Sequence, residues 1–215
     1  MTSTFARACL LGLIGACTAT AGQAQARRQV KQPPAELVAA FDYDNAAPRH
    51  ILSQASVDLM SVLIGQADYP SGDVATVLDG LEQVALSGAS LNVRAEAALT
   101  LSVAGSRDAR QPQPTTLARL ERIYARSDDP QVRAAVVSGL ARAAEHRRTL
   151  VFLEKVAAKD PADYPGASLD ALASIASHDE PGRAVLKRLH TTGAVHDGHA
   201  QQWLDIVASR GYRIR

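Results

Sequence analysis

The residues of this chain best suited to chemistry are three histidines near its C-terminus, in the stretch LHTTGAVHDGHAQQW. His190, His196 and His199, with Asp197 among them, could bind zinc or copper, because imidazole and carboxylate groups are ordinary ligands of these metals. Their spacing, H-x5-H-x2-H, matches no catalytic motif such as H-E-x-x-H. A polar loop that ends near the cap of a last helix is the simpler interpretation, and a metal site is the alternative.

The stretch FDYDN, with Asp42, Asp44 and Asn45, resembles the start of a calcium-binding loop. No glycine and no distal glutamate follow at the spacing that such a loop needs. The sequence therefore predicts a turn here, with Phe41 and Tyr43 packed beneath it. The motifs of serine nucleophiles are missing around Ser87, Ser90, Ser138 and Ser168. We therefore expect neither an enzyme nor a bound cofactor.

The N-terminal residues 1–26 have the pattern of a secretory signal peptide. Arg7 precedes an uncharged, apolar run over residues 8–21, and Ala24-Gln25-Ala26 is a small-x-small cleavage site. The apolar run is too short for a stable membrane span, so no transmembrane segment is expected. The competing interpretation is an apolar first core helix. The signal pattern predicts an exported bacterial protein, either periplasmic or secreted.

Both cysteines, Cys9 and Cys17, lie inside this segment. The stretch LIGAC, which ends at Cys17, resembles a lipobox, so an outer-membrane lipoprotein with its lipid anchor at Cys17 is an alternative. After cleavage at Ala26 the mature chain has no cysteine. This excludes disulfides, thiol catalysis and cysteine zinc sites from the mature protein.

The charge of the chain is balanced, with 23 Lys and Arg against 22 Asp and Glu. The signal segment holds one arginine and no acid, so the remainder is balanced as well. A nucleic-acid-binding protein would carry a basic excess, and 4% aromatic residues leave little material for stacking on bases. We therefore expect no nucleic acid as the partner.

Apolar residues recur at helical spacing along most of the chain, and no segment alternates as a strand would. The pattern predicts an all-α protein with three parts: the signal peptide (1–26), a polar leader with a short helix at 35–41 (27–48), and a helical domain (49–215). Within that domain, helices are predicted at about 49–66, 73–86, 91–103, 115–126, 127–145, 148–158, 167–177, 178–190 and 199–210.

The helical domain repeats itself. Val93-Arg94-Ala95 lies 39 residues before Val132-Arg133-Ala134, and Leu101 lies 39 residues before Leu140. A shift of 32 residues maps Asp128 onto Asp160. Units of 30-odd residues, each a pair of helices, are typical of an α-solenoid.

The stretches DPQVRAA, from Asp129, and VRAEAAL, from Val93, resemble the HEAT-repeat family. The resemblance implies a right-handed α-solenoid of antiparallel helix pairs, with three to four repeats and a C-terminal capping helix closed by Trp203. It also implies a non-catalytic binding module or scaffold whose partner is another protein. The alternative function is an envelope metal-binding or enzyme-accessory protein that uses His190, His196 and His199. The pattern is broken by Pro165, which aligns with Arg133, and by the long loop 105–114. A non-repetitive helical bundle is the competing fold.

The opening of one helix in the repeat can be predicted in detail. Asp128 or Asp129 should cap the helix, and Pro130 suits its first turn. Arg94 and Arg133 then occupy equivalent positions in successive units. They are expected to bond loop groups between repeats, or to form a basic edge that binds an acidic partner.

Overall fold

The computed structural model describes residues 28–30, 32–44, 54–69, 71–143, 146–159, 171–172, 175–176, 180–194, 201 and 205. The predicted signal peptide with Cys9 and Cys17, the histidines His196 and His199, and Trp203 lie outside these residues.

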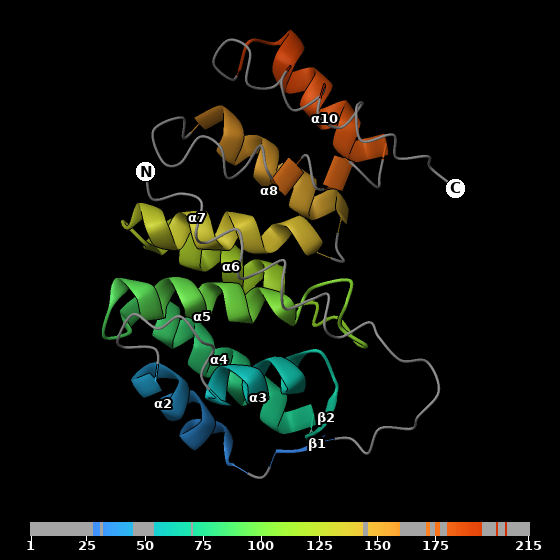
Figure 1. Ribbon diagram of the computed structural model, residues 1–215. Coiled ribbons are helices and arrows are strands. Elements are labelled where there is room, and N and C mark those ends of the chain that lie inside the picture. Colours follow the sequence, from blue (N-terminus) through green and yellow to red (C-terminus); the bar gives the residue numbers. More distant parts are fainter. Residues whose placement is uncertain are drawn as a thin grey trace.

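The described part of the chain is all-α, as the sequence predicts (Figure 1). Its helices are α2 (Pro34–Asp44), α3 (Gln54–Leu63), α4 (Ser71–Ser87), α5 (Leu91–Val103), α6 (Thr116–Arg126), α7 (Pro130–Gly139), α8 (His146–Lys159) and α10 (Glu180–Thr191), and a short 3-10 helix η1 (Leu140–Arg142) follows α7. The helices predicted at 91–103, 115–126 and 148–158 begin and end within two residues of α5, α6 and α8. None of the described helices is both long and apolar enough to cross a membrane.

Two expectations need correction. A pair of two-residue strands, β1 (Arg28–Gln29) and β2 (Ala67–Asp68), forms a parallel ladder where no strand was predicted. Segments this short show no alternation that a sequence could reveal. The turn expected at Asp42 is instead the last turn of α2, which continues to Asp44.

Helix α2, predicted to lie in a leader, packs against both α3 and α4. Its Leu37 and Phe41 are fully buried in the same core as the rest of the helices. Gly80 of α4 allows the close approach, because a Cβ atom there would lie 2.9 Å from Val38 of α2. The helical core therefore begins at α2.

Each described helix packs mainly on helices near it in the chain. Helix α5 contacts α3, α4, α6 and α7, and α6 contacts α4 and α7. Helix α10 packs against α8. Because α5 has neighbours on several sides, its small Ala95, Ala97 and Ala98 are all buried alongside Val93 and Leu101. This explains why the helix is so rich in alanine.

The start of α7 confirms the predicted cap. The Oδ1 atom of Asp129 accepts hydrogen bonds from the backbone N–H groups of Gln131, at 2.8 Å, and Val132, at 3.2 Å. Pro130 is the first helical residue, where no N–H donor is required. Val132, Val136 and Leu140 are buried, as their spacing predicts.

Candidate functional site

Arg133 ties the start of α7 to the end of α6. Its Nε donates a hydrogen bond of 2.7 Å to the carbonyl of Ser127, the residue that follows α6. Its guanidinium carbon lies 5.4 Å from the centre of the Tyr124 ring. Tyr124 in turn meets Phe152 of α8 edge to face, with ring centres 5.4 Å apart. Arg133 therefore makes the contacts of a residue that holds helices together.

Arg183 of α10 makes an equivalent bond. Its Nε donates to the carbonyl of Ala176 at 2.9 Å. In both places an arginine in the first turn of a helix reaches back to a carbonyl just before that helix. The last carbonyls of a helix lack partners within it, so such a bond stabilises the connection.

Arg94 aligns with Arg133 in the sequence but differs in its contacts. Its side chain is half-buried, and its Nε is buried without a hydrogen-bond partner. Among the described residues it forms no ion pair. A buried donor without a partner costs free energy, so Arg94 carries a cost that the hydrogen bond of Arg133 avoids. The two arginines thus have different roles, although they share one motif.

Glu96 lies two residues further along α5, and burial raises the pKa of its carboxyl group. No nearby charge or hydrogen bond offsets that effect in the described part of the chain. Leu91, at the start of the same helix, is 42% exposed. Helix α5 therefore presents an exposed apolar residue together with two charged groups, Arg94 and Glu96, for which the described part of the chain offers no partner.

A series of ion pairs joins α4, α6, α8 and α10. Glu82 of α4 accepts from Arg119 and Arg122 of α6, at 2.7 and 2.8 Å. The next two links are Glu121 of α6 with Arg148 of α8, at 2.7 Å, and Glu154 of α8 with Arg188 of α10, at 2.6 Å. Each link joins an acid on one helix to an arginine on a later one.

Two of these links favour the ionised form of their acids, Glu82 and Glu154. Hydrogen bonds from Arg122 and Arg119 lower the pKa of Glu82, and those from Arg188 lower the pKa of Glu154, in both cases against burial, which raises it. The series was not predicted from the sequence, although Glu82 and Glu121 stand 39 residues apart, the same period as Arg94 and Arg133.

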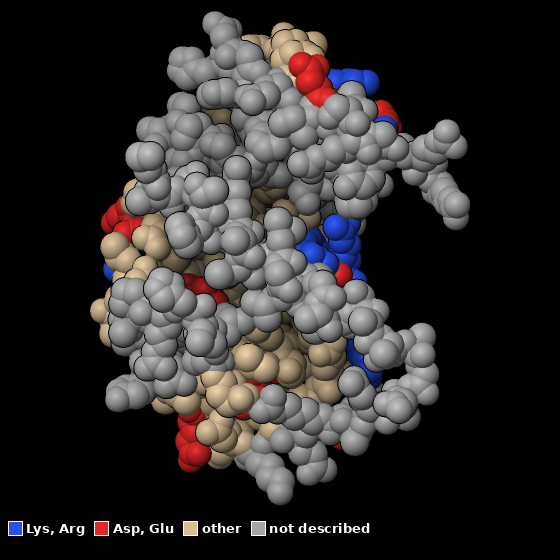
Figure 2. All heavy atoms as spheres, in the orientation of Figure 1, with Lys and Arg blue, Asp and Glu red and all other residues tan. Residues whose placement is uncertain are grey.

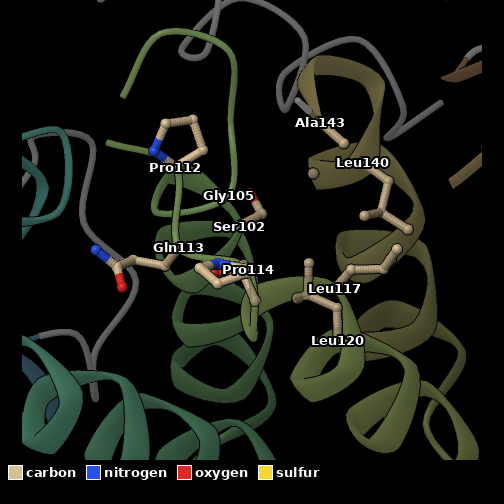
Figure 3. A pocket seen from close by; sticks show the side chains of 11 residues that line it. Ser102, Gly105, Pro112, Gln113, Pro114, Leu117, Leu120, Leu140 and Ala143 are labelled. Atoms are coloured by element: carbon tan, nitrogen blue, oxygen red, sulfur yellow. The ribbon is translucent and has the colours of Figure 1, made fainter. Parts of the chain in front are cut away.

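A cavity of 210 Å³ lies where α5 ends, α6 begins and α7 ends. Figure 3 shows Pro112, Gln113 and Pro114 on one side of it and Leu140 and Ala143 on the other. The three residues on the first side belong to the loop 105–114, which breaks the repeat pattern of the sequence. No sequence signal marked this cavity.

His190 is exposed in the last turn of α10. The described residues contain no group of three side chains suited to hold a metal ion. The other two histidines of the predicted cluster, His196 and His199, lie outside the described residues, so the metal site stays a prediction.

Comparisons with known proteins found no matching family model, no matching curated protein and no matching solved structure.

Proposed function

We propose that the chain is an exported, non-catalytic scaffold, built as a HEAT-like α-solenoid, that binds another protein through one surface of its helical stack. The helix contacts support this proposal. Helix α5 packs on both α3 and α7, and α4 packs on both α2 and α6. Helices two apart in the chain are thus neighbours, which is how the repeats of a solenoid stack.

The observation that carries the proposal is the series of ion pairs from α4 to α10. Its links, Glu82–Arg122, Glu121–Arg148 and Glu154–Arg188, join α4 to α6, α6 to α8 and α8 to α10 in turn. In a solenoid each unit contacts only its neighbours, so the same kind of link recurs from unit to unit. A globular bundle would have no reason to repeat one link in this direction.

The binding surface in this proposal is the face of α5 that carries Arg94 and Leu91. The guanidinium of Arg133 already bonds the Ser127 carbonyl and lies over the Tyr124 ring. The Nε of Arg94 has no hydrogen-bond partner in the described part of the chain. Leu91 stands three residues before Arg94, on the same side of the helix. A partner with an acidic group beside an apolar one would complement both.

The test is a site-specific photocrosslink in the native cell envelope. The photoreactive residue replaces Leu91 in one variant and Val151 in another, since Val151 of α8 is 63% exposed and serves as the control position. We expect one adduct from position 91, lost on Arg94→Glu in a variant that retains its helical circular dichroism, and none from position 151. The same adducts at both positions, or none from either, would contradict the proposal. Mass spectrometry of the N-terminal peptide tests export in the same sample.

A further inference from the structure

The cavity at the loop 105–114 has a mostly apolar lining. Pro112, Pro114, Leu117, Leu140 and Ala143 contribute to it. At 210 Å³ it is smaller than the roughly 300 Å³ or more that a drug-sized ligand needs. A dry cavity of roughly 150 Å³ can take a benzene ring, so this one has room for a single large apolar side chain.

Polar groups that favour an anion lie in the same place. Thr116, in the cavity lining, is 1% exposed, and its hydroxyl has no hydrogen-bond partner. Helix α6 begins here without a side-chain cap, and its Thr116 N–H donates to the carbonyl of Gln113 at 3.1 Å. The start of a helix carries a partial positive charge that attracts carboxylates. Both features suit a negatively charged oxygen atom near the apolar cavity.

Two arginines of the loop 105–114, which also supplies Pro112, Gln113 and Pro114 to the cavity lining, are available for such a partner. Arg107 and Arg110 are exposed, and neither forms an ion pair with any described residue. The backbone places them: the Arg107 N–H donates to the carbonyl of Arg142 at 2.9 Å, and the Arg110 N–H donates to that of Ile64 at 3.1 Å. Asp108, between them, is bound to Arg142 at 2.6 Å. The free charge of the loop is therefore positive.

Figure 2 shows Lys and Arg side chains, with an acidic group beside them, toward the right-hand edge of the molecule. Helix α6 has eleven residues, so its two ends lie roughly 15 Å apart at 1.5 Å per residue. Arg126 stands at its C-terminal end, exposed and also without an ion pair among the described residues, so it provides a matched control.

We propose that this cavity and its arginines, Arg107 and Arg110, form a docking site for an acidic segment of a partner protein. One apolar side chain of the segment enters the cavity, and its carboxylates meet the two arginines and the start of α6. The proposal rests on the scaffold function proposed above, and it adds the chemistry of the partner and a second contact surface, distinct from the Arg94 face of α5.

The test uses a defined probe, a nine-residue peptide with one leucine between two runs of four glutamates and with both ends blocked. Its affinity for the protein purified from the envelope is measured by isothermal titration calorimetry at low and at high salt. We expect binding that weakens about tenfold when Arg107 and Arg110 are changed to Glu, and little change with Arg126→Glu. Replacing the leucine of the probe by serine should weaken binding by about tenfold as well.

The cavity itself is tested by Ala143→Leu, which fills it, and by Gln113→Trp at its half-buried side, should the first variant fail to fold. In either folded variant the affinity for the leucine probe should fall, and the affinity for the serine probe should stay the same. The proposal would be overturned if the unaltered protein did not bind the probe. It would also be overturned if Arg126→Glu weakened binding as much as the changes at Arg107 and Arg110, or if filling the cavity left the affinity for the leucine probe unchanged. The crosslink from position 91 does not depend on this cavity, so its result separates failure of the docking site from failure of the scaffold function.

Discussion

Glu82 of α4 accepts two hydrogen bonds from Arg122 of α6, at 2.8 Å from Nε and at 2.9 Å from Nη2. Arg119 adds a third bond of 2.7 Å, and the side chain of Glu82 is only 13% exposed. These bonds lower the pKa of Glu82, those of Arg122 most strongly. One carboxylate thus joins two helices that are separated in the chain by α5.

The change Glu82→Gln keeps the size of the side chain and removes its charge. We expect the free energy of unfolding at pH 7 to fall by about 1 kcal/mol, a figure discounted for the exposure of Arg122. Because folding lowers this pKa, the stabilisation is present above the unfolded pKa of about 4.3 and is lost as the pH falls through the folded value. Urea unfolding at pH 7, 4 and 3 should therefore show that the free energies of unfolding of the variant and the unaltered protein become more similar as the pH falls.

The control for this change is Asp79→Asn. Asp79 also binds Arg119, at 2.6 Å, but its side chain is 68% exposed. Solvent screens an exposed ion pair, so the loss should be smaller than for Glu82. If both variants lost the same free energy of unfolding, burial of Glu82 would not strengthen its ion pairs between α4 and α6.

The all-α class and the ends of several helices follow from local chemistry, and the sequence therefore reveals them. Asp129 and Pro130 specify the start of α7 without help from any distant residue. The pairing of Glu82 with Arg122 depends instead on how α4 and α6 are rotated against each other, which periodicity does not determine. The cavity needs the ends of three helices and a loop to meet, so no local pattern marks it.

Arg94 and Arg133 show the same limit within a single motif. The sequence places them at equivalent positions, and it leaves open whether they bond loop groups or bind a partner. Arg133 bonds the Ser127 carbonyl, whereas the Nε of Arg94 has no partner. A motif therefore identified the positions, but the contacts of each one depend on its neighbours in space.

The change Arg133→Lys should destabilise the protein, because lysine lacks the Nε–H that bonds Ser127 and the planar group that lies over Tyr124. We expect a loss of about 1–2 kcal/mol, the sum of one hydrogen bond and one exposed cation–π contact. Arg94→Lys is the matched control, since it removes an Nε that has no partner. If Arg94→Lys lowered the free energy of unfolding as much as Arg133→Lys, the two arginines would not have the different roles assigned to them.

Glu96 should respond in the opposite sense to Glu82. Burial raises its pKa, so between the unfolded and folded pKa values the folded state binds more protons, and stability falls as the pH rises through that range. Above the folded pKa the ionised carboxylate carries the desolvation cost, and below it the folded state must keep the proton. Glu96→Gln should therefore increase the free energy of unfolding at pH 7 by roughly 1 kcal/mol and have little effect at pH 3.

Glu121→Gln is the control for this prediction. It makes the same chemical change on α6, but Glu121 is bound to Arg148 at 2.7 Å. Removing that charge should lower stability slightly at pH 7. Thermal unfolding of the two variants side by side should thus shift in opposite directions, and a destabilised Glu96→Gln would refute the assignment of Glu96 as a buried charge without a partner.

The close approach of α5 and α7 depends on Gly139. A Cβ atom there would lie 2.5 Å from the Oγ of Ser102 and 2.6 Å from its Cβ, so one of the helices would have to shift. We expect Gly139→Ala to cost about 1–3 kcal/mol through overpacking. If the clash with Ser102 is the cause, adding Ser102→Gly should restore part of the loss.

Gly193 separates this steric effect from backbone strain. It has a positive φ of 62° with open space around its Cβ position, so Gly193→Ala should cost about 1 kcal/mol through conformation alone. Ser102→Gly has no contact through which to rescue that variant. A double-mutant cycle should therefore show coupling between Gly139 and Ser102 and simple additivity between Gly193 and Ser102. Additivity in both cycles would mean that Gly139 is required for a reason other than the distance between α5 and α7.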